Sequence, residues 1–151
     1  MITSPSWRGE RYAVLGLARS GAATLNALLA SGARVTAWDS NEDRLHSVKA
    51  QFGAENDPPG SWVVFAQNNA SADFSDPVET DLTGFAGVVV SPGVPLNRHP
   101  IAAKARAAGV PVIGDIELFA QARDYLPSHR VVGITGTNGK STTTALIHHI
   151  L

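Results

Sequence analysis

A glycine-rich turn near residue 140 constrains the fold of this chain more than any other feature of its sequence. The β-branched run Val131–Ile134 precedes the turn, and an apolar segment follows it. Glycines let backbone N–H groups surround an anion, the N-terminus of a following helix adds partial positive charge, and a lysine adds a full one. This order predicts a strand, a phosphate-binding loop and a helix. The predicted loop consists of Gly136, Thr137, Asn138, Gly139, Lys140, Ser141 and Thr142.

The side chains of this loop fit separate tasks in binding a nucleoside triphosphate. Lys140 would reach the β- and γ-phosphates and act as the catalytic cation, and Ser141 (or Thr142) would hold Mg²⁺ through its hydroxyl. Ile134 occupies the first glycine position of the usual G-x-x-x-x-G-K-[ST] pattern, so the loop is a variant of that pattern. The alternative is a solvent-exposed Gly-Lys turn that binds nothing.

Strands alternate with helices in the part of the chain before this loop. The expected strands span residues 12–15, 34–38, 62–66, 87–90 and 110–113, and the expected helices span residues 20–30, 41–52, 99–108 and 115–122. Residues 68–81 are polar, and we expect them to be irregular. The alternation predicts an α/β fold, a Rossmann-like doubly wound parallel sheet that binds ligands at the carboxyl ends of its strands.

The same pattern predicts how the chain divides into domains. Residues 1–123 would form the Rossmann-like domain, and residues 124–130, which include Pro127, would be a linker. Residues 131–151 would begin a second domain with the strand, phosphate loop and helix described above.

Composition excludes several classes of protein. Of the 151 residues, 44% are hydrophobic and 17% are charged, which favours a packed core over disorder. The net charge is −1 without a basic cluster, so we expect no nucleic-acid partner. The absence of cysteine excludes disulfides and thiolate metal sites. No apolar segment is long enough to span a membrane, so a cytoplasmic protein without membrane insertion is expected.

A first glycine turn, Gly16-x-Ala18-x-x-Gly21, follows the first expected strand, and Asp39 ends the next one. This arrangement is typical of dinucleotide-binding domains, in which an acidic residue holds a ribose hydroxyl. Here the methyl group of Ala18 hinders the close approach of a pyrophosphate, while Arg19 and Ser20 add side-chain donors. The turn predicts a ligand that carries a nucleotide. The alternatives are an NAD-binding module, or glycines that serve only turning and packing.

A second turn, Ser91–Pro95, follows the strand expected at 87–90. Its two prolines stiffen the segment, and Gly93 leaves the backbone open to a ligand. By itself the turn indicates only a rigid connection. A role in ligand binding is favoured because the turn would lie at the same ligand-binding edge of the sheet as Ser20 and Asp39.

Together these motifs resemble those of the Mur ligases, the ATP-dependent amide-bond ligases of bacterial peptidoglycan synthesis. The resemblance rests on residues 16–21, 91–95, 114–119 and 136–142. It implies an enzyme of three domains: the first binds a UDP moiety, the central one is an ATPase, and the last binds the incoming amino acid. This chain would hold the first domain and the leading edge of the second.

The resemblance also implies an activity, the joining of D-glutamate to UDP-N-acetylmuramoyl-L-alanine through an acyl phosphate. ATP and Mg²⁺ would be the cofactors. The partners would be small molecules, namely the UDP-linked substrate, ATP and D-glutamate, and the enzyme would be a monomer. The 151 residues alone would be inactive as a ligase. The residues implied for the UDP-linked substrate are Arg19, Ser20, Asp39, Ser40, Asn41 and Gly93. Asn41, which can cap the helix expected at 41–52, stands where the resemblance would place a basic residue. Another Mur-type or folylpolyglutamate-type ligase is an alternative, because those enzymes share the ATP loop.

Overall fold

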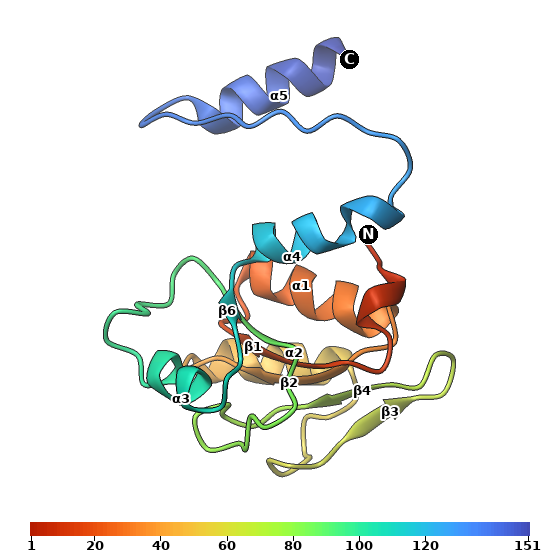
Figure 1. Cartoon of the computed structure of the whole chain (residues 1–151), viewed down its shortest axis with the longest axis vertical. Helices are drawn as coiled ribbons and strands as arrows, with labels where there is room; N and C mark the ends of the chain where they lie inside the picture. Colours follow the sequence, from red (N-terminus) through yellow and green to blue (C-terminus); the bar gives the residue numbers. More distant parts are fainter.

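Strand β1 (Arg11–Leu15) lies inside a six-stranded sheet in a computed structural model that describes residues 1–151 (Figure 1). The strand order is β3-β4-β2-β1-β5-β6. The other strands are β2 (Arg34–Trp38), β3 (Val63–Phe65), β4 (Ala70–Asp73), β5 (Gly87–Val90) and β6 (Val112–Ile113). All neighbours pair in parallel except β3, which runs antiparallel to β4 at one edge. The α/β class and Rossmann-like order are confirmed, but the sheet is mixed rather than wholly parallel.

The helices connect and follow these strands. They are α1 (Arg19–Ala30), α2 (Glu42–Gln51), α3 (Ile101–Ala107), α4 (Asp115–Ala122) and α5 (Lys140–Ile150), with short 3₁₀ helices at Pro5–Trp7 and Arg123–Tyr125. Helix α1 ends before Gly32, whose φ of 87° is a left-handed conformation that glycine adopts without strain. Asn41 precedes helix α2, and its side chain caps the helix by accepting the Arg44 N–H at 2.8 Å, as predicted.

Alternation along the central strands produces a core on each face of the sheet. In β1, Tyr12 and Val14 belong to a cluster of 19 buried residues that includes side chains of α1, α2 and α4. Ala13 and Leu15 belong instead to a cluster of nine buried residues with side chains of α3. Helices α1 and α4 lie side by side over the sheet (Figure 1). Because both faces are covered, the central strands read as continuous apolar runs.

A strand at residues 70–73 contradicts the expectation from sequence. Residues 68–81 were expected to be irregular, yet Ala70–Asp73 form β4, and all four residues are buried. Their small and polar side chains carry no strand signal of their own, so pairing with β2 and β3 decides the structure. Asn69, with φ of 57°, makes the turn from β3 into β4. The buried Asp73 carboxylate accepts hydrogen bonds from the Gly60 N–H and the Ser75 hydroxyl.

The topology brings two connecting loops together. From β1 the chain moves to β2 on one side of the sheet, whereas β5 pairs with the other side of β1 and leads to β6. The loops that follow β1 and β5 therefore start side by side at the carboxyl edge. Such a reversal of strand order is where open α/β sheets bind ligands.

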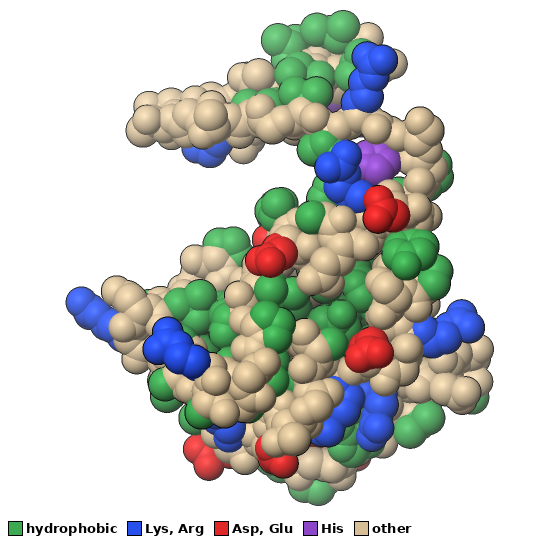
Figure 2. Space-filling view, in the orientation of Figure 1, with side chains coloured by type: hydrophobic (Ala, Val, Ile, Leu, Met, Phe, Trp, Pro, Cys, Tyr) green, Lys and Arg blue, Asp and Glu red, His purple; other side chains and the backbone are tan.

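The segment after Tyr125 leaves the sheet and its helices behind. Figure 1 shows residues 126–139 leading away from them, with α5 lying apart. Residues 131–134, expected to be a strand, pair with no other strand, and a strand needs a neighbour for its backbone hydrogen bonds. No residue of α5 is buried, and Leu146 and Ile150 are exposed. Figure 2 shows hydrophobic side chains on the surface of this part of the chain. None of the helices is both long and apolar enough to cross a membrane.

Candidate functional site

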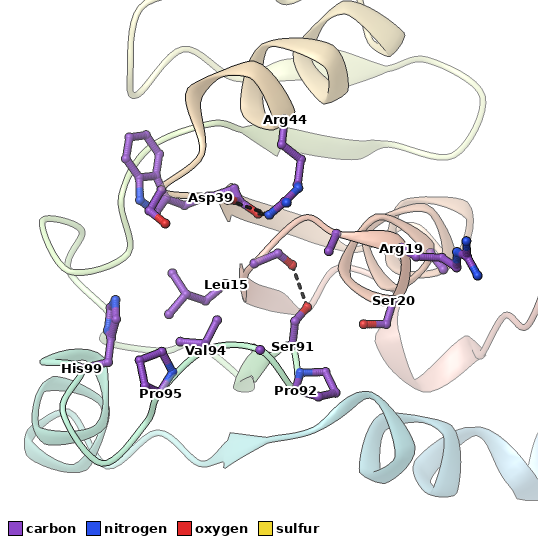
Figure 3. A pocket seen from close by; sticks show the side chains of 16 residues that line it. Leu15, Arg19, Ser20, Asp39, Arg44, Ser91, Pro92, Val94, Pro95 and His99 are labelled. Carbon is purple, nitrogen blue, oxygen red and sulfur yellow. Dashed lines mark hydrogen bonds and ion pairs between the residues drawn. The ribbon is translucent and has the colours of Figure 1, made fainter. Parts of the chain in front are cut away.

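A pocket of about 650 Å³ opens at the carboxyl edge of the sheet, between the loops that follow β1, β2 and β5 (Figure 3). Five of the six residues expected to contact a UDP-linked substrate line this pocket: Arg19, Ser20, Asp39, Ser40 and Gly93. The sixth, Asn41, lies outside it and caps α2. The fold thus brings together residues that are more than 70 positions apart in the sequence.

The glycines of the first turn have a packing role. Gly16 has φ of 88°, and its N–H donates to the Trp38 carbonyl at 2.8 Å. A Cβ atom at Gly21 would lie 1.7 Å from the carbonyl oxygen of Gly16, so α1 crosses that backbone with no room for a side chain. The Ser91 hydroxyl donates to the same carbonyl at 2.7 Å. This bond ties the loop after β1 to the loop after β5.

The N-terminus of α1 faces the pocket without a side-chain cap. Ala18 occupies the N-cap position and supplies no capping hydrogen bond, and the Ala22 N–H donates to the Ala18 carbonyl at 2.9 Å. The amides just before Ala22 therefore have no acceptor within the helix. Free amides and the positive end of the helix dipole attract an anion such as a phosphate.

Asp39 is the most constrained polar residue of the pocket, with only 4% of its side chain exposed. Oδ2 accepts from the Leu17 N–H at 2.6 Å and from Arg44 Nη1 at 3.0 Å. Oδ1 accepts from the Asn41 N–H at 2.8 Å and from Arg44 Nη1 at 3.2 Å. Two carboxylate oxygens offer about four acceptor sites, so the protein itself uses the full capacity of this side chain.

These donors set the pKa of Asp39. Burial is the largest single influence and raises the pKa, because it disfavours the charged form. The backbone hydrogen bonds from Asn41 and Leu17, with the hydrogen bond and charge of Arg44, together outweigh it and lower the pKa below its ordinary value. Asp39 is therefore held as a carboxylate that joins the loop after β1 to α2.

Replacing Asp39 with asparagine is expected to flatten the acid dependence of stability. A carboxylate with a lowered pKa in the folded state stabilises the protein above its unfolded pKa of about 4, and this contribution is lost as the pH falls through the folded value. Urea unfolding at pH 6, 5, 4 and 3 would measure it, with Asp124→Asn as a control of equal charge change outside the network. Identical slopes for wild type and Asp39→Asn between pH 5 and 3 would contradict the described bonding.

Sequence reasoning missed three side chains of this pocket. Trp38 ends β2, Arg44 lies in the first turn of α2, and His99 precedes α3. A signal for Arg44 existed, because an N-cap at Asn41 places the residue three positions later over the start of the helix. His99 had no comparable signal, because its position depends on the path of the loop after β5.

The phosphate loop is formed but lies apart from this pocket (Figure 1). Gly136 and Gly139 have φ of 145° and 79°, and Gly139 is the N-cap of α5. The Lys140 ammonium donates to the Gly136 carbonyl, so the lysine closes over its own loop. All seven residues predicted to bind a nucleoside triphosphate are exposed. The Ser141 hydroxyl is a hard oxygen ligand suited to Mg²⁺, but no cluster of three or more His, Cys, Asp or Glu residues accompanies it.

Comparison with known proteins gives a consistent result along the whole chain. The chain is 62% identical over 150 residues to the UDP-N-acetylmuramoylalanine–D-glutamate ligase of Novosphingobium aromaticivorans, covering 99% of this chain and 29% of that protein. The enzyme of the same name from Sphingopyxis alaskensis is 62% identical over 151 residues, covering 100% of this chain and 30% of the relative. The enzyme of that name from Zymomonas mobilis is 56% identical over 155 residues, covering 100% of this chain and 33% of the relative. The chain thus spans about a third of the length of these relatives or slightly less. No protein-family model matches it.

Proposed function

We propose that this chain, which belongs to the UDP-N-acetylmuramoylalanine–D-glutamate ligases, contributes the part of such a ligase that binds the UDP-linked substrate and begins the part that binds ATP. We assign residues 1–123 to substrate binding, residues 124–130 to a linker and residues 131–151 to the start of the ATP-binding domain. The whole enzyme would add D-glutamate to UDP-N-acetylmuramoyl-L-alanine in peptidoglycan synthesis.

The observation that carries this proposal is the pocket at the reversal of strand order. Its walls offer the uncapped amides of α1, the hydroxyl of Ser20 and the open backbone at Gly93, which suit the oxygens of a diphosphate. Ser40 and Asn41 follow the end of β2, and we assign them to the side that faces uracil and ribose, with Asp39 holding this wall through its bonds to Leu17, Asn41 and Arg44. Arg19 completes the proposed set of substrate-binding residues.

We assign ATP binding to the loop 136–142 and the role of catalytic cation to Lys140. The substrate carboxylate would attack the γ-phosphate of ATP, which gives an acyl phosphate and ADP, and the amine of D-glutamate would then displace phosphate to form the amide. Lys140 would bear on the first step by offsetting negative charge that develops on the transferred group. Mg²⁺, held in part by the Ser141 hydroxyl, would supply further charge neutralisation when bound.

An NAD-binding module is the second candidate that the sequence raised. It would require Asp39 to accept hydrogen bonds from an adenosine ribose. Three donor atoms of the protein, the amide nitrogens of Leu17 and Asn41 and Arg44 Nη1, already make four hydrogen bonds to the two oxygens of that carboxylate. This bonding weighs against NAD and favours a ligand that is held by donors of the protein.

Calorimetric titration with UDP, UDP-N-acetylmuramoyl-L-alanine and NAD tests the proposal. We expect saturable binding of both UDP ligands and none of NAD, since dinucleotide-binding domains hold the adenosine ribose through an acidic residue and Asp39 has no free acceptor for it. Binding of NAD without binding of the UDP ligands would overturn the proposal and favour the dinucleotide module. Uridine serves as a control that separates recognition of the diphosphate from recognition of the nucleoside.

A further inference from the structure

Arg44 carries hydrogen-bond donors that the protein does not use. Its Nη1 donates to both oxygens of Asp39, in the only ion pair of the structure, while Nε and Nη2 donate to no acceptor of the protein. The side chain is 44% exposed and lines the pocket. An arginine carries five N–H donors in a fixed planar fork, so most of its capacity remains free for a ligand.

Asp39 fixes where these donors lie. One oxygen, Oδ2, accepts both from the Leu17 N–H and from Arg44 Nη1, which places the guanidinium beside the turn that begins α1. Because Asp39 is buried and bonded on both oxygens, the guanidinium is held before a ligand arrives. Such pre-positioning reduces the entropy lost on binding.

The other arginine of the pocket is placed differently. Arg19 is the first residue of α1, and it makes no hydrogen bond or ion pair with another side chain. Figure 3 shows its guanidinium directed away from Asp39 and Arg44, on the outer side of the helix start. The remaining titratable side chains that line the pocket are Asp39, whose charge Arg44 and two amides already balance, and His99. Arg44 is thus the cation of the pocket lining whose position is fixed by an ion pair.

We propose that Arg44, rather than Arg19, is the arginine that binds the diphosphate of the substrate, and that Asp39 is the positioning residue that holds it. The free Nε and Nη2 donors would contact phosphate oxygens together with the amides at the start of α1. This inference rests on the proposed function, and it names the residue through which the pocket would prefer UDP to uridine. Arg44 is not among the six residues that the sequence indicated for the UDP-linked substrate.

Titration of UDP and uridine into wild type, Arg44→Gln, Arg19→Gln and Arg44→Lys tests the assignment. Arg44→Gln should weaken UDP binding by about 10-fold to 100-fold, the range for a hydrogen bond to a charged group, and leave uridine binding unchanged. Arg19→Gln should change UDP affinity by less than about 3-fold. Arg44→Lys keeps the charge but loses the planar fork, so it should fall between wild type and Arg44→Gln.

The outcomes separate this inference from the proposed function. If UDP binds wild type and Arg19→Gln is the variant that loses affinity, the inference is overturned and the proposed function stands. If wild type binds no UDP, both are overturned. Equal losses of UDP and uridine affinity in Arg44→Gln would indicate a distorted pocket rather than a lost phosphate contact and would also overturn the inference. Far-UV circular dichroism and urea midpoints confirm that each variant is folded before titration.

Discussion

Replacing Gly21 with alanine is expected to destabilise the domain more than any other single methyl group added to the pocket. The new Cβ would lie 1.7 Å from the Gly16 carbonyl oxygen and 2.7 Å from the Ser91 hydroxyl oxygen. The 1.7 Å contact is with backbone, which cannot be relieved by a side-chain rotation, so α1 must move away from β1. That movement breaks the packing of Leu25 and Leu28, both fully buried, against the sheet. We expect a loss of at least about 3 kcal/mol in the free energy of unfolding.

Urea unfolding followed by tryptophan fluorescence measures this loss, since the chain has three tryptophans. Gly114→Ala is the matched control, because Gly114 has φ of −95° and a Cβ there would meet no atom within 4 Å. Gly114 is the N-cap of α4, where alanine is slightly unfavourable, whereas the effect of glycine on the unfolded chain slightly favours alanine, so the control measures these small effects without a steric clash. A Gly21→Ala protein as stable as the Gly114→Ala protein would mean that α1 does not cross Gly16 as closely as described.

Replacing Lys140 with alanine is expected to abolish most ligation by the complete ligase while leaving the binding of the UDP-linked substrate intact. Loss of one charged group that stabilises a transferring phosphoryl group costs about 10²- to 10³-fold in rate. The phosphate loop lies apart from the substrate pocket in this structure, so the affinity for UDP should not change. Release of phosphate measures the rate, and calorimetry with UDP measures the affinity.

The chain offers a matched lysine for this experiment. Lys49 donates to the Asp57 carbonyl at 2.7 Å, away from both the pocket and the phosphate loop. Lys49→Ala should therefore keep its ligation rate. A ligation rate for Lys140→Ala within a few-fold of wild type would remove Lys140 from the proposed catalytic role, and an equal fall in UDP affinity would indicate that the two regions are coupled.

The elements that sequence predicted best carry their signals locally. Strand β5 and helix α4 have the predicted bounds. An apolar run that ends at Ser91-Pro92 indicates β5, and acidic residues in the first turn indicate the start of α4. Asn41 capped α2 as predicted, because an amide oxygen at an N-cap needs only the next turn of chain. The positions of Ser20, Asp39 and Gly93 at one edge followed from the rule that parallel strands end together.

The elements that sequence missed depend on distant partners. Strand β4 forms because β2 and β3 pair with its backbone. Its small side chains give no sequence signal for this pairing. Residues 131–134 have strong strand propensity but no neighbouring strand. Asp39 was predicted to accept a bond from a ligand, whereas in the structure Arg44 donates to both of its oxygens. Side-chain pairing across five residues is set by rotamers, not by spacing.

The order of the elements along the chain has a consequence for synthesis on the ribosome. Every residue that lines the substrate pocket lies at or before His99, the last strand ends at Ile113, and α4, which completes the larger core, ends at Ala122. Translation releases the chain from its N-terminus, and domains fold as units as they emerge. The pocket can therefore take up its ligand before the phosphate loop has left the ribosome. A bound ligand would then protect the nascent domain from proteases, because binding to the folded state alone lowers the unfolded population.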